Sequence, residues 1–361
     1  MPVETVEVPV THPYRVFIGA GLDLAEIFSR TLEPGLCAIF TDSKVGPLHA
    51  ARVQDALQRA GWRVAVKIEV PSGESSKSLE VYADSLSRLA RLGMTRDGTI
   101  FALGGGVVGD LGGFVAGTYM RGIGLVMLPT SLLAMVDSAV GGKVGVDLPE
   151  GKNLVGAFLR PRLVAADLAW IATLPEREIS NGLAETIKMG LLSGGAFFDD
   201  LALIGAARTG DLDALETLVL HSIRFKSQVV AEDELEGGLR QVLNYGHTVG
   251  HALEAAADYH LQHGQAVAAG MLAAANLSRN RFGRDLTGVH EDLIAAADLP
   301  RRVPDVGVER TLLAMGRDKK RLAADGPAGH RFVLLEDIGR PVRGVPVSEE
   351  EAREAIGAIV E

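Results

Sequence analysis

Apolar and polar residues follow different patterns in the two parts of this chain. In the first part, short apolar or alternating runs predict strands at residues 6–10, 14–19, 36–42, 63–70 and 99–106. Between these runs, residues 49–62 and 76–93 carry apolar side chains at helical spacing. Strands that alternate with helices predict a mainly parallel sheet covered on both faces, with the first two strands forming a hairpin.

After about residue 174 the pattern becomes helical and is rich in Ala, Leu and Glu. A strand-like run appears only at residues 330–339. We therefore predict an α/β domain over residues 1–174 and a mostly α-helical domain over residues 175–361. The sequence contains no internal repeat or low-complexity linker between them. We expect the active site in a cleft between the two domains, where ligand sites are common.

Composition narrows the class of protein without naming a function. The 361 residues are 47% hydrophobic and 23% charged, as in ordinary globular proteins. A net charge of -10 argues against a nucleic-acid partner. The single cysteine, Cys37, lies in an apolar run and is predicted to be a core residue, so we expect a reducing, cytoplasmic location. No secretory signal and no membrane-spanning run is recognisable.

A glycine-rich loop follows the predicted strand at residues 99–106. Gly104, Gly106 and Gly109 form a G-x-G-x-x-G pattern that can cradle a pyrophosphate at a helix N-terminus. The acidic residue usual about 20 positions downstream is absent, but Asp42 ends an earlier strand. A further polar loop at residues 71–77 also follows a strand. Together these loops favour a dinucleotide site over the alternative of a simple glycine turn.

The middle of the chain sets basic residues among glycine and apolar residues. Arg121, Lys143 and Lys152 lie in this segment with Asp137 and Asn153. A single such lysine is usually a solvated loop residue. Repeated basic residues beside glycines, which allow close approach of a ligand, indicate an anion site. We expect a phosphorylated or carboxylated substrate.

Histidines are concentrated between residues 243 and 265. His247 and His251 are spaced i,i+4 and would share a helix face, whereas His263 begins the next helical pattern. Glu185, with Lys188 one turn further on, lies in an apolar helical segment and is the candidate carboxylate ligand. Zinc binds such nitrogen and oxygen donors. Spacing alone does not choose which two histidines join Glu185, and a polar network without metal is the alternative.

Motifs along most of the chain carry a resemblance to a known family. They lie at residues 104–110, 128–146, 151–158, 173–188, 233–254, 263–271 and 318–320. In this order and spacing, from about residue 42 to residue 335, the chain resembles the 3-dehydroquinate synthase family. The glycine loop and the metal-ligand pattern alone are shared with iron-containing alcohol dehydrogenases and glycerol dehydrogenases. The resemblance implies an NAD-binding first domain, and a second domain that binds metal and substrate.

The resemblance also implies a reaction. It would be an NAD- and zinc- or cobalt-dependent lyase of the shikimate pathway, which supplies chorismate and the aromatic amino acids. Its sugar-phosphate substrate, 3-deoxy-D-arabino-heptulosonate 7-phosphate, would become 3-dehydroquinate and phosphate. Transient oxidation, phosphate elimination, re-reduction and aldol closure would leave NAD unchanged. The enzyme would be a homodimer.

The family pattern implies roles for individual residues. The implied metal ligands are Glu185, His247 and His263. The implied substrate residues are Lys188, Asn153, Asn244, His251 and Lys319 near the phosphate, Arg121 reaching the phosphate of a neighbouring subunit, and Lys226 and Arg240 at the carboxylate with Lys143 and Asp137 nearby. The implied cofactor contacts are Asp42, Glu74, Lys77, Gly105, Gly106, Val107, Asp110, Thr130, Ser131, Lys143, Lys152 and Thr173.

Three alternatives remain at this point. Another sugar-phosphate cyclase, such as 2-deoxy-scyllo-inosose synthase, would act on a substrate without a carboxylate and would leave Lys226 and Arg240 without a purpose. A metal-dependent polyol dehydrogenase would need no phosphate-binding lysines and would change the redox state of NAD. A non-catalytic protein of the same fold would not need the complete set of proposed ligands.

Overall fold

The computed structural model describes residues 3–316 and 329–361, and the chain divides into two units. The first unit consists of Met1–Leu174 and Lys226–Leu235, and the second of Pro175–Phe225 and Glu236–Glu361. Within the described ranges, no helix combines the length and the apolar character needed to cross a membrane.

The segment from residue 226 to 235 departs from the predicted division, which had placed it in the helical domain. It groups with the first unit instead. Lys226 donates a hydrogen bond to the carbonyl oxygen of Asp137, and Glu234 pairs with Arg160. These contacts join residues far apart in the sequence, so the local helical pattern could not reveal them.

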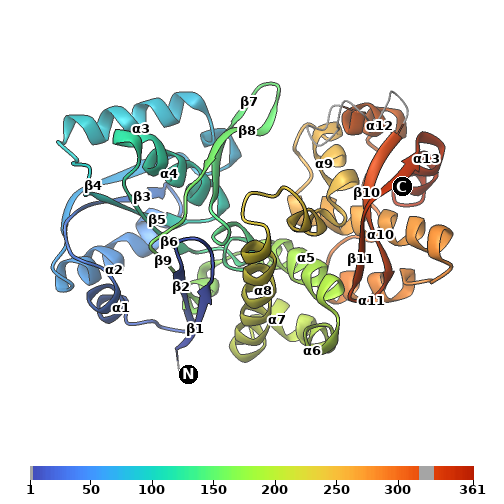
Figure 1. Cartoon of the computed structure of the whole chain (residues 1–361), viewed down its shortest axis with the longest axis horizontal. Coiled ribbons are helices and arrows are strands. Elements are labelled where there is room, and N and C mark those ends of the chain that lie inside the picture. The colour runs from blue at the N-terminus through green and yellow to red at the C-terminus, as the bar shows by residue number, and fades with distance from the viewer. Residues whose placement is uncertain (1–2, 317–328) are drawn as a thin grey trace. The chain divides into compact units, whose positions relative to one another are not determined.

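A seven-stranded sheet forms the centre of the first unit (Figure 1). The strands lie in the order β1 (Glu4–Val8), β2 (Tyr14–Gly19), β9 (Leu163–Asp167), β6 (Gly124–Pro129), β5 (Thr99–Gly104), β3 (Leu36–Asp42) and β4 (Arg63–Val70). All neighbours are parallel except the β1–β2 hairpin. β5, β6 and β9 are buried at every residue, which explains their continuous apolar runs.

Helices cover both faces of this sheet, as the alternating pattern predicts. They are α1 (Leu24–Thr31), α2 (Val45–Arg59), α3 (Leu79–Arg91) and α4 (Gly106–Thr118). The chain passes from β3 to β4 in one direction across the sheet, and from β5 to β6 in the other. Right-handed crossovers therefore put α2 and α4 on opposite faces, with α1 beside α2 and α3 beside α4 (Figure 1).

A separate hairpin, which the sequence did not predict, carries Lys143 and Lys152 of the middle segment. It pairs β7 (Lys143–Leu148) with β8 (Gly151–Phe158) and packs on α4. Gly145 and Gly156 face each other across the two strands. A Cβ on Gly156 would lie 2.3 Å from the carbonyl oxygen of Val144, so the strands can approach this closely only with glycine there.

The second unit is mainly helical. Its helices are α5 (Glu176–Ser193), α6 (Gly195–Asp200), α7 (Ile204–Arg208), α9 (His247–Ala256), α10 (His263–Phe282), α11 (Thr287–Ala296), α12 (Val308–Gly316) and α13 (Glu349–Gly357). α8 (Leu212–Glu232) begins in this unit and ends in the first. The predicted strand at residues 330–339 is β10 (Gly329–Asp337), and it pairs with β11 (Arg340–Ser348), which was not predicted.

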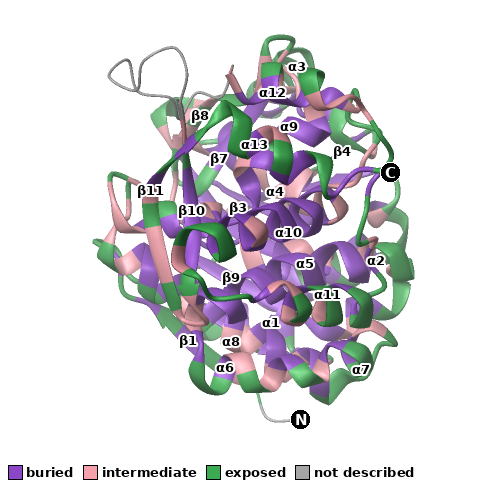
Figure 2. Ribbon diagram, turned by 90° about the vertical axis from the view of Figure 1, so that its right-hand side faces the viewer, coloured by how far each residue is buried: buried purple, intermediate pink, exposed green. Residues whose placement is uncertain are grey.

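α10 is the central helix of the second unit. It contacts α5, α9, α11, α13 and β10, and Figure 2 shows both α5 and α10 as buried over most of their length. Its run of alanines and glycines allows α9 to approach closely. A Cβ on Gly270 would lie 1.9 Å from the carbonyl oxygen of Gly246. This close packing fixes the start of α9, where His247 lies.

Candidate active site

The carboxyl ends of β3 and β5 form the first part of the candidate site. β3 leads to β4 on one side and β5 leads to β6 on the other, so the strand order reverses between β3 and β5. Ligands of open α/β sheets bind outside the carboxyl ends of the strands at such a switch point. Asp42 ends β3, and the glycine loop follows β5. The structure thus brings together the two features that the sequence associated with a dinucleotide.

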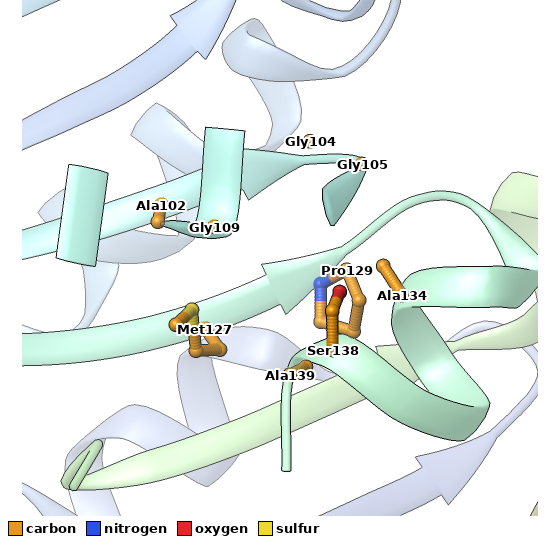
Figure 3. A pocket seen from close by; sticks show the side chains of 9 residues that line it. All are labelled: Ala102, Gly104, Gly105, Gly109, Met127, Pro129, Ala134, Ser138 and Ala139. Atoms are coloured by element: carbon orange, nitrogen blue, oxygen red, sulfur yellow. The ribbon is translucent and has the colours of Figure 1, made fainter. Parts of the chain in front are cut away.

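The glycine loop leads directly into α4. Gly105 is its N-cap and offers no side chain, so the first backbone N–H groups of α4 are not capped from within. A Cβ on Gly105 would lie 3.3 Å from Oγ of Ser131, and one on Gly106 would lie 3.2 Å from Oγ of Ser138. Figure 3 shows a small pocket between this loop and the segment after β6, lined in part by Gly104, Gly105, Pro129 and Ser138.

Other predicted cofactor residues surround this edge and have partners within the unit. Asp42 accepts hydrogen bonds from the backbone of Lys44 and Val45, 2.8 and 2.9 Å away, and so holds the start of α2. Thr130 directly follows β6, and its N–H donates to the carbonyl oxygen of Gly104. Oγ1 of Thr173 lies 3.0 Å from Nε2 of His49.

Lys77 is buried and forms the centre of a polar network. Its ammonium lies 2.6 Å from Oδ2 of Asp110 and also donates to Oδ1 of Asn153. Burial alone would lower the pKa of Lys77, but the carboxylates of Asp110 and Glu74 raise it, so the lysine is charged. The predicted cofactor residue Lys77 therefore contacts Asp110 and also Asn153, which the resemblance assigned to the substrate. Lys152 lies 3.7 Å from Glu74.

Lys226, which is buried, and Asp137, which is half-buried, form a second ion pair of the first unit. Nζ of Lys226 lies 2.6 Å from both the carbonyl oxygen and Oδ1 of Asp137. Asp137 belongs to a π-helical turn, Ala134–Ser138, a form that is frequent at functional sites. The structure thus joins two residues that the resemblance placed near the substrate carboxylate.

The candidate metal site lies within the second unit. Glu185 comes from the middle of α5, His247 is the first residue of α9, and His263 is the first residue of α10. One ligand atom from each lies within 4.8 Å of the others. Nε2 of each histidine is 3.3 Å from Oε1 of Glu185. Donors at about 2.0–2.1 Å from a tetrahedral Zn²⁺ lie about 3.3 Å apart, so these residues fit that ion.

Both histidines present Nε2 to the site because Nδ1 has another partner. Nδ1 of His247 lies 3.1 Å from the carbonyl oxygen of Tyr245, and Nδ1 of His263 lies 2.6 Å from Oε1 of Glu254. Such outer acceptors fix the tautomer and orientation of metal-binding histidines. Burial would lower the pKa of His263, but the carboxylates of Glu185 and Glu254 raise it to about 10 in the absence of an ion.

Lys188 sits beside the candidate ligands. It is 2% exposed and forms an ion pair with Glu185 one turn earlier on α5. Burial opposes ionisation of Glu185, but the nearby ammonium group holds the pKa of that carboxyl well below its usual range. The site therefore keeps a charged carboxylate ready for a cation.

His251 adjoins the site without belonging to the ligand group. Its ring centroid is 5.0 Å from that of His247 and 6.0 Å from that of His263. The ligand group found among the described residues pairs His247 with His263, and not with the i,i+4 neighbour.

Similarity to known proteins identifies the family of this chain. Models described as 3-dehydroquinate synthase N-terminal and C-terminal match residues 67–181 and 182–321, together more than half of the chain. A 3-dehydroquinate synthase of Symbiobacterium thermophilum is 46% identical over 320 residues, covering 85% of this chain and 88% of that protein. One from Xanthomonas axonopodis pv. citri is 45% identical and covers 96% of each chain. The chain belongs to the 3-dehydroquinate synthase family.

The fold of this chain is similar to that of solved structures of other enzymes. A crystal structure of 2-deoxy-scyllo-inosose synthase complexed with carbaglucose-6-phosphate, NAD+ and Co2+ has a TM-score of 0.85 and 28% identity, covering 98% of this chain and 99% of that one. Glycerol dehydrogenase from Schizosaccharomyces pombe has a TM-score of 0.67 at 19% identity, covering 94% and 87%. The second likeness concerns the fold alone. The predicted fold class is confirmed.

The remaining residues implied by the family pattern are found in both units. In the second unit, Arg240 is 2% exposed and lies with Asn244 in a 3-10 segment, Leu239–Asn244, that leads toward α9. In the first, Lys143 begins β7 and Arg121 ends the turn after α4. Val107 lies in the first turn of α4. Lys319 lies outside the described residues.

Sequence reasoning missed the outer partners of the histidines. Glu254 is 2% exposed, and it follows His247 by seven residues on α9. A carboxylate two helical turns after a candidate ligand, within an alanine-rich run, was the available signal. The partner of His247 is the backbone carbonyl of Tyr245, and because every residue has such a carbonyl, the sequence could not single it out.

Proposed function

We propose that this chain is a 3-dehydroquinate synthase, a lyase that converts 3-deoxy-D-arabino-heptulosonate 7-phosphate to 3-dehydroquinate and phosphate. The observation that carries the proposal is that models of this family match most of the chain. Glu185 and His247, both buried, and half-buried His263 add a group whose spacing fits a divalent metal. Relatives with this activity in their names match at 45–46% identity over most of the chain. The proposed chemistry is oxidation, phosphate elimination, reduction, ring opening and aldol closure.

Two bound groups are part of this proposal. The structural relative that contains NAD+ and Co2+ supports a dinucleotide and a divalent metal, Zn²⁺ or Co²⁺, in this chain as well. When bound, NAD+ would accept and return a hydride, and the metal would polarise substrate hydroxyl oxygens as a Lewis acid. Glu185, His247 and His263 would hold the metal. The implied cofactor contacts, from Asp42 to Thr173, would hold NAD+ at the carboxyl ends of the strands.

Cationic side chains would bind the two anionic groups of the substrate. In the second unit, Lys188 lies next to Glu185, and His251 lies next to His247. We assign both to the phosphate, with Asn244, Asn153 and Lys319. Lys226 and Arg240 would bind the carboxylate, with Lys143 and Asp137 nearby. Lys226 is 5% and Arg240 2% exposed, so a carboxylate bound there would be little screened by water.

The assembly is also a proposal. Arg121 would complete the phosphate site of a second subunit in a homodimer. A left-handed backbone at Arg121, with φ of 69°, holds this exposed turn in an unusual conformation. We expect the enzyme to act in the cytoplasm.

One assay tests the proposal. The zinc-loaded protein is incubated with the heptulosonate phosphate and an amount of NAD+ far below that of substrate. We expect phosphate and dehydroquinate in equal amounts over many turnovers, without accumulation of NADH. Absence of phosphate release, with zinc and NAD+ shown to be bound, would refute the assignment.

The same assay separates the nearest competitor. 2-deoxy-scyllo-inosose synthase is a structural relative at 28% identity, and glucose 6-phosphate is the substrate to test for that activity. We expect no phosphate release from glucose 6-phosphate, because it offers no carboxylate to Lys226 and Arg240. Steady NADH formation with simple polyols would indicate a dehydrogenase instead.

A further inference from the structure

Glu254 lies directly behind His263 as seen from the candidate metal site. The carboxylate is 2% exposed, and its Oε1 is 2.6 Å from Nδ1 of His263. The other nitrogen of the same ring, Nε2, is 3.3 Å from Oε1 of Glu185. The imidazole is thus held at both nitrogens, by a carboxylate from α9 and by a carboxylate from α5.

The two carboxylates make different demands on the ring. An ionised carboxylate can only accept a hydrogen bond, so the short contact with Glu254 places a proton on Nδ1. When a metal occupies the site, Nε2 must offer its lone pair, and a proton held at Nδ1 keeps Nε2 in that form. His247 obtains the same tautomer from a neutral acceptor, the carbonyl oxygen of Tyr245. Of these two histidines, only His263 has a charged acceptor at Nδ1.

The backbone of His263 is fixed separately. The N–H of Gly264 donates to Oδ1 of Asn181 on α5. A Cβ on Gly264 would lie 2.5 Å from the carbonyl oxygen of Asn181, so α5 and the start of α10 are in close contact. With the backbone held there, the orientation of the ring is the freedom that remains, and Glu254 restricts it.

We propose that Glu254 is a positioning residue for the metal site, which fixes the tautomer and the orientation of His263. The inference rests on the proposed metal site. A purely structural ion pair would lower the stability of the protein when broken, but would leave the geometry of the bound metal unchanged. The two roles therefore differ in what a bound ion reports.

The test compares Glu254→Gln and Glu254→Ala with Glu291→Gln, which removes an exposed carboxylate on α11. Zinc affinity is measured by competition with a chelator, and the geometry of the site by visible absorption of the Co²⁺ form. We expect zinc affinity to fall about 10- to 100-fold in both Glu254 variants, as for other outer partners of metal-binding histidines. The cobalt spectrum should change as well, whereas Glu291→Gln should match the unmodified protein in both measurements.

Several outcomes would decide against Glu254. Unchanged zinc affinity and cobalt spectrum in folded Glu254→Gln would overturn the inference. In a His263→Ala background, Glu254→Gln should have little further effect on zinc affinity, because Glu254 is proposed to act through the His263 ring. A loss as large as in the unmodified protein would also overturn the inference. Failure of the unmodified protein to bind zinc would instead refute the metal site of the proposed function. If the variants do not fold, magnetic resonance of the isotope-labelled, cadmium-loaded unmodified protein must show His263 protonated at Nδ1 and coupled to the metal through Nε2; the reverse pattern refutes the inference.

Discussion

The carbonyl oxygen of Gly246 lies only 1.9 Å from the position that a Cβ on Gly270 would occupy. Because Gly246 immediately precedes His247, the contact between α9 and α10 sets where this candidate ligand stands. The same helix pair carries His263 at the start of α10. The metal site thus depends on the absence of one side chain in the core.

The first prediction concerns this contact. Gly270→Ala should lower the free energy of unfolding of the metal-free protein by about 1–3 kcal/mol, the usual effect of overpacking a core. It should also weaken zinc binding, since α9 must move and carries His247. Denaturant unfolding and zinc titration measure the two effects. Gly288→Ala on α11 is the matched control, because a Cβ there meets nothing within 4 Å. Equal behaviour of the two variants would contradict this account of the packing.

The histidines give a second prediction. His247→Ala and His263→Ala should each lose bound zinc, because each removes one of three ligands. His251→Ala should keep the metal and lose turnover, because its ring lies beside the ligand group and is assigned to the substrate phosphate. Metal content after dialysis and phosphate release measure the two properties. Loss of zinc from His251→Ala, with zinc retained in His263→Ala, would reverse the assignment.

The sequence predicted those parts of the fold that follow from local patterns. Alternating strands and helices led to the parallel sheet, and this placed Asp42 and the glycine loop at the same sheet edge. Spacing could not choose between His251 and His263, because an i,i+4 relation describes one helix and not what faces it. The family resemblance made that choice, and the ligand group of the structure contains His263.

What the sequence did not predict depends on contacts between distant residues. The hairpin of β7 and β8 is interrupted by glycines and contains Asn153 with φ of 55°, so its strand pattern is weak. The attachment of residues 226–235 to the first unit depends on partners 74 and 89 positions away. Glu254 looked like an ordinary helix residue, since its burial comes from packing in the unit and not from its neighbours in sequence.

Lys188 gives a third prediction, in which its replacement lowers the stability of the metal-free protein but raises the affinity for zinc. Lys188→Met removes the ammonium group beside Glu185, so the metal-free protein should lose about 3–5 kcal/mol of stability, as when a buried ion pair is broken on one side. Zinc should bind more tightly, because a positive charge no longer competes for the carboxylate. Turnover should fall through loss of the phosphate contact. Calorimetric titration with zinc checks the sign, and weaker zinc binding in a folded variant would refute the argument.

His290 gives the last prediction, on stability and pH. It is fully buried. Nδ1 donates a hydrogen bond to the carbonyl oxygen of Leu286, 2.7 Å away, and Nε2 accepts one from the hydroxyl of Tyr245, 2.8 Å away. Burial lowers the pKa of His290 from 6.5 to about 4, although the Leu286 carbonyl acts in the other direction. Between these values the unfolded chain binds a proton that the folded protein does not. The folded state should therefore lose about 1.4 kcal/mol per pH unit as the pH falls through this interval.

Two variants isolate this effect. His290→Gln should be less stable at neutral pH. Between pH 6.5 and about 4, however, its unfolding free energy should fall less steeply with decreasing pH, because one fewer proton is taken up on unfolding. Tyr245→Phe keeps His290 and removes only its hydroxyl partner, so its slope should stay close to that of the unmodified protein while its stability falls. Denaturant unfolding at several pH values gives both slopes. An unchanged slope in His290→Gln would show that protonation of His290 does not limit the acid stability of this unit.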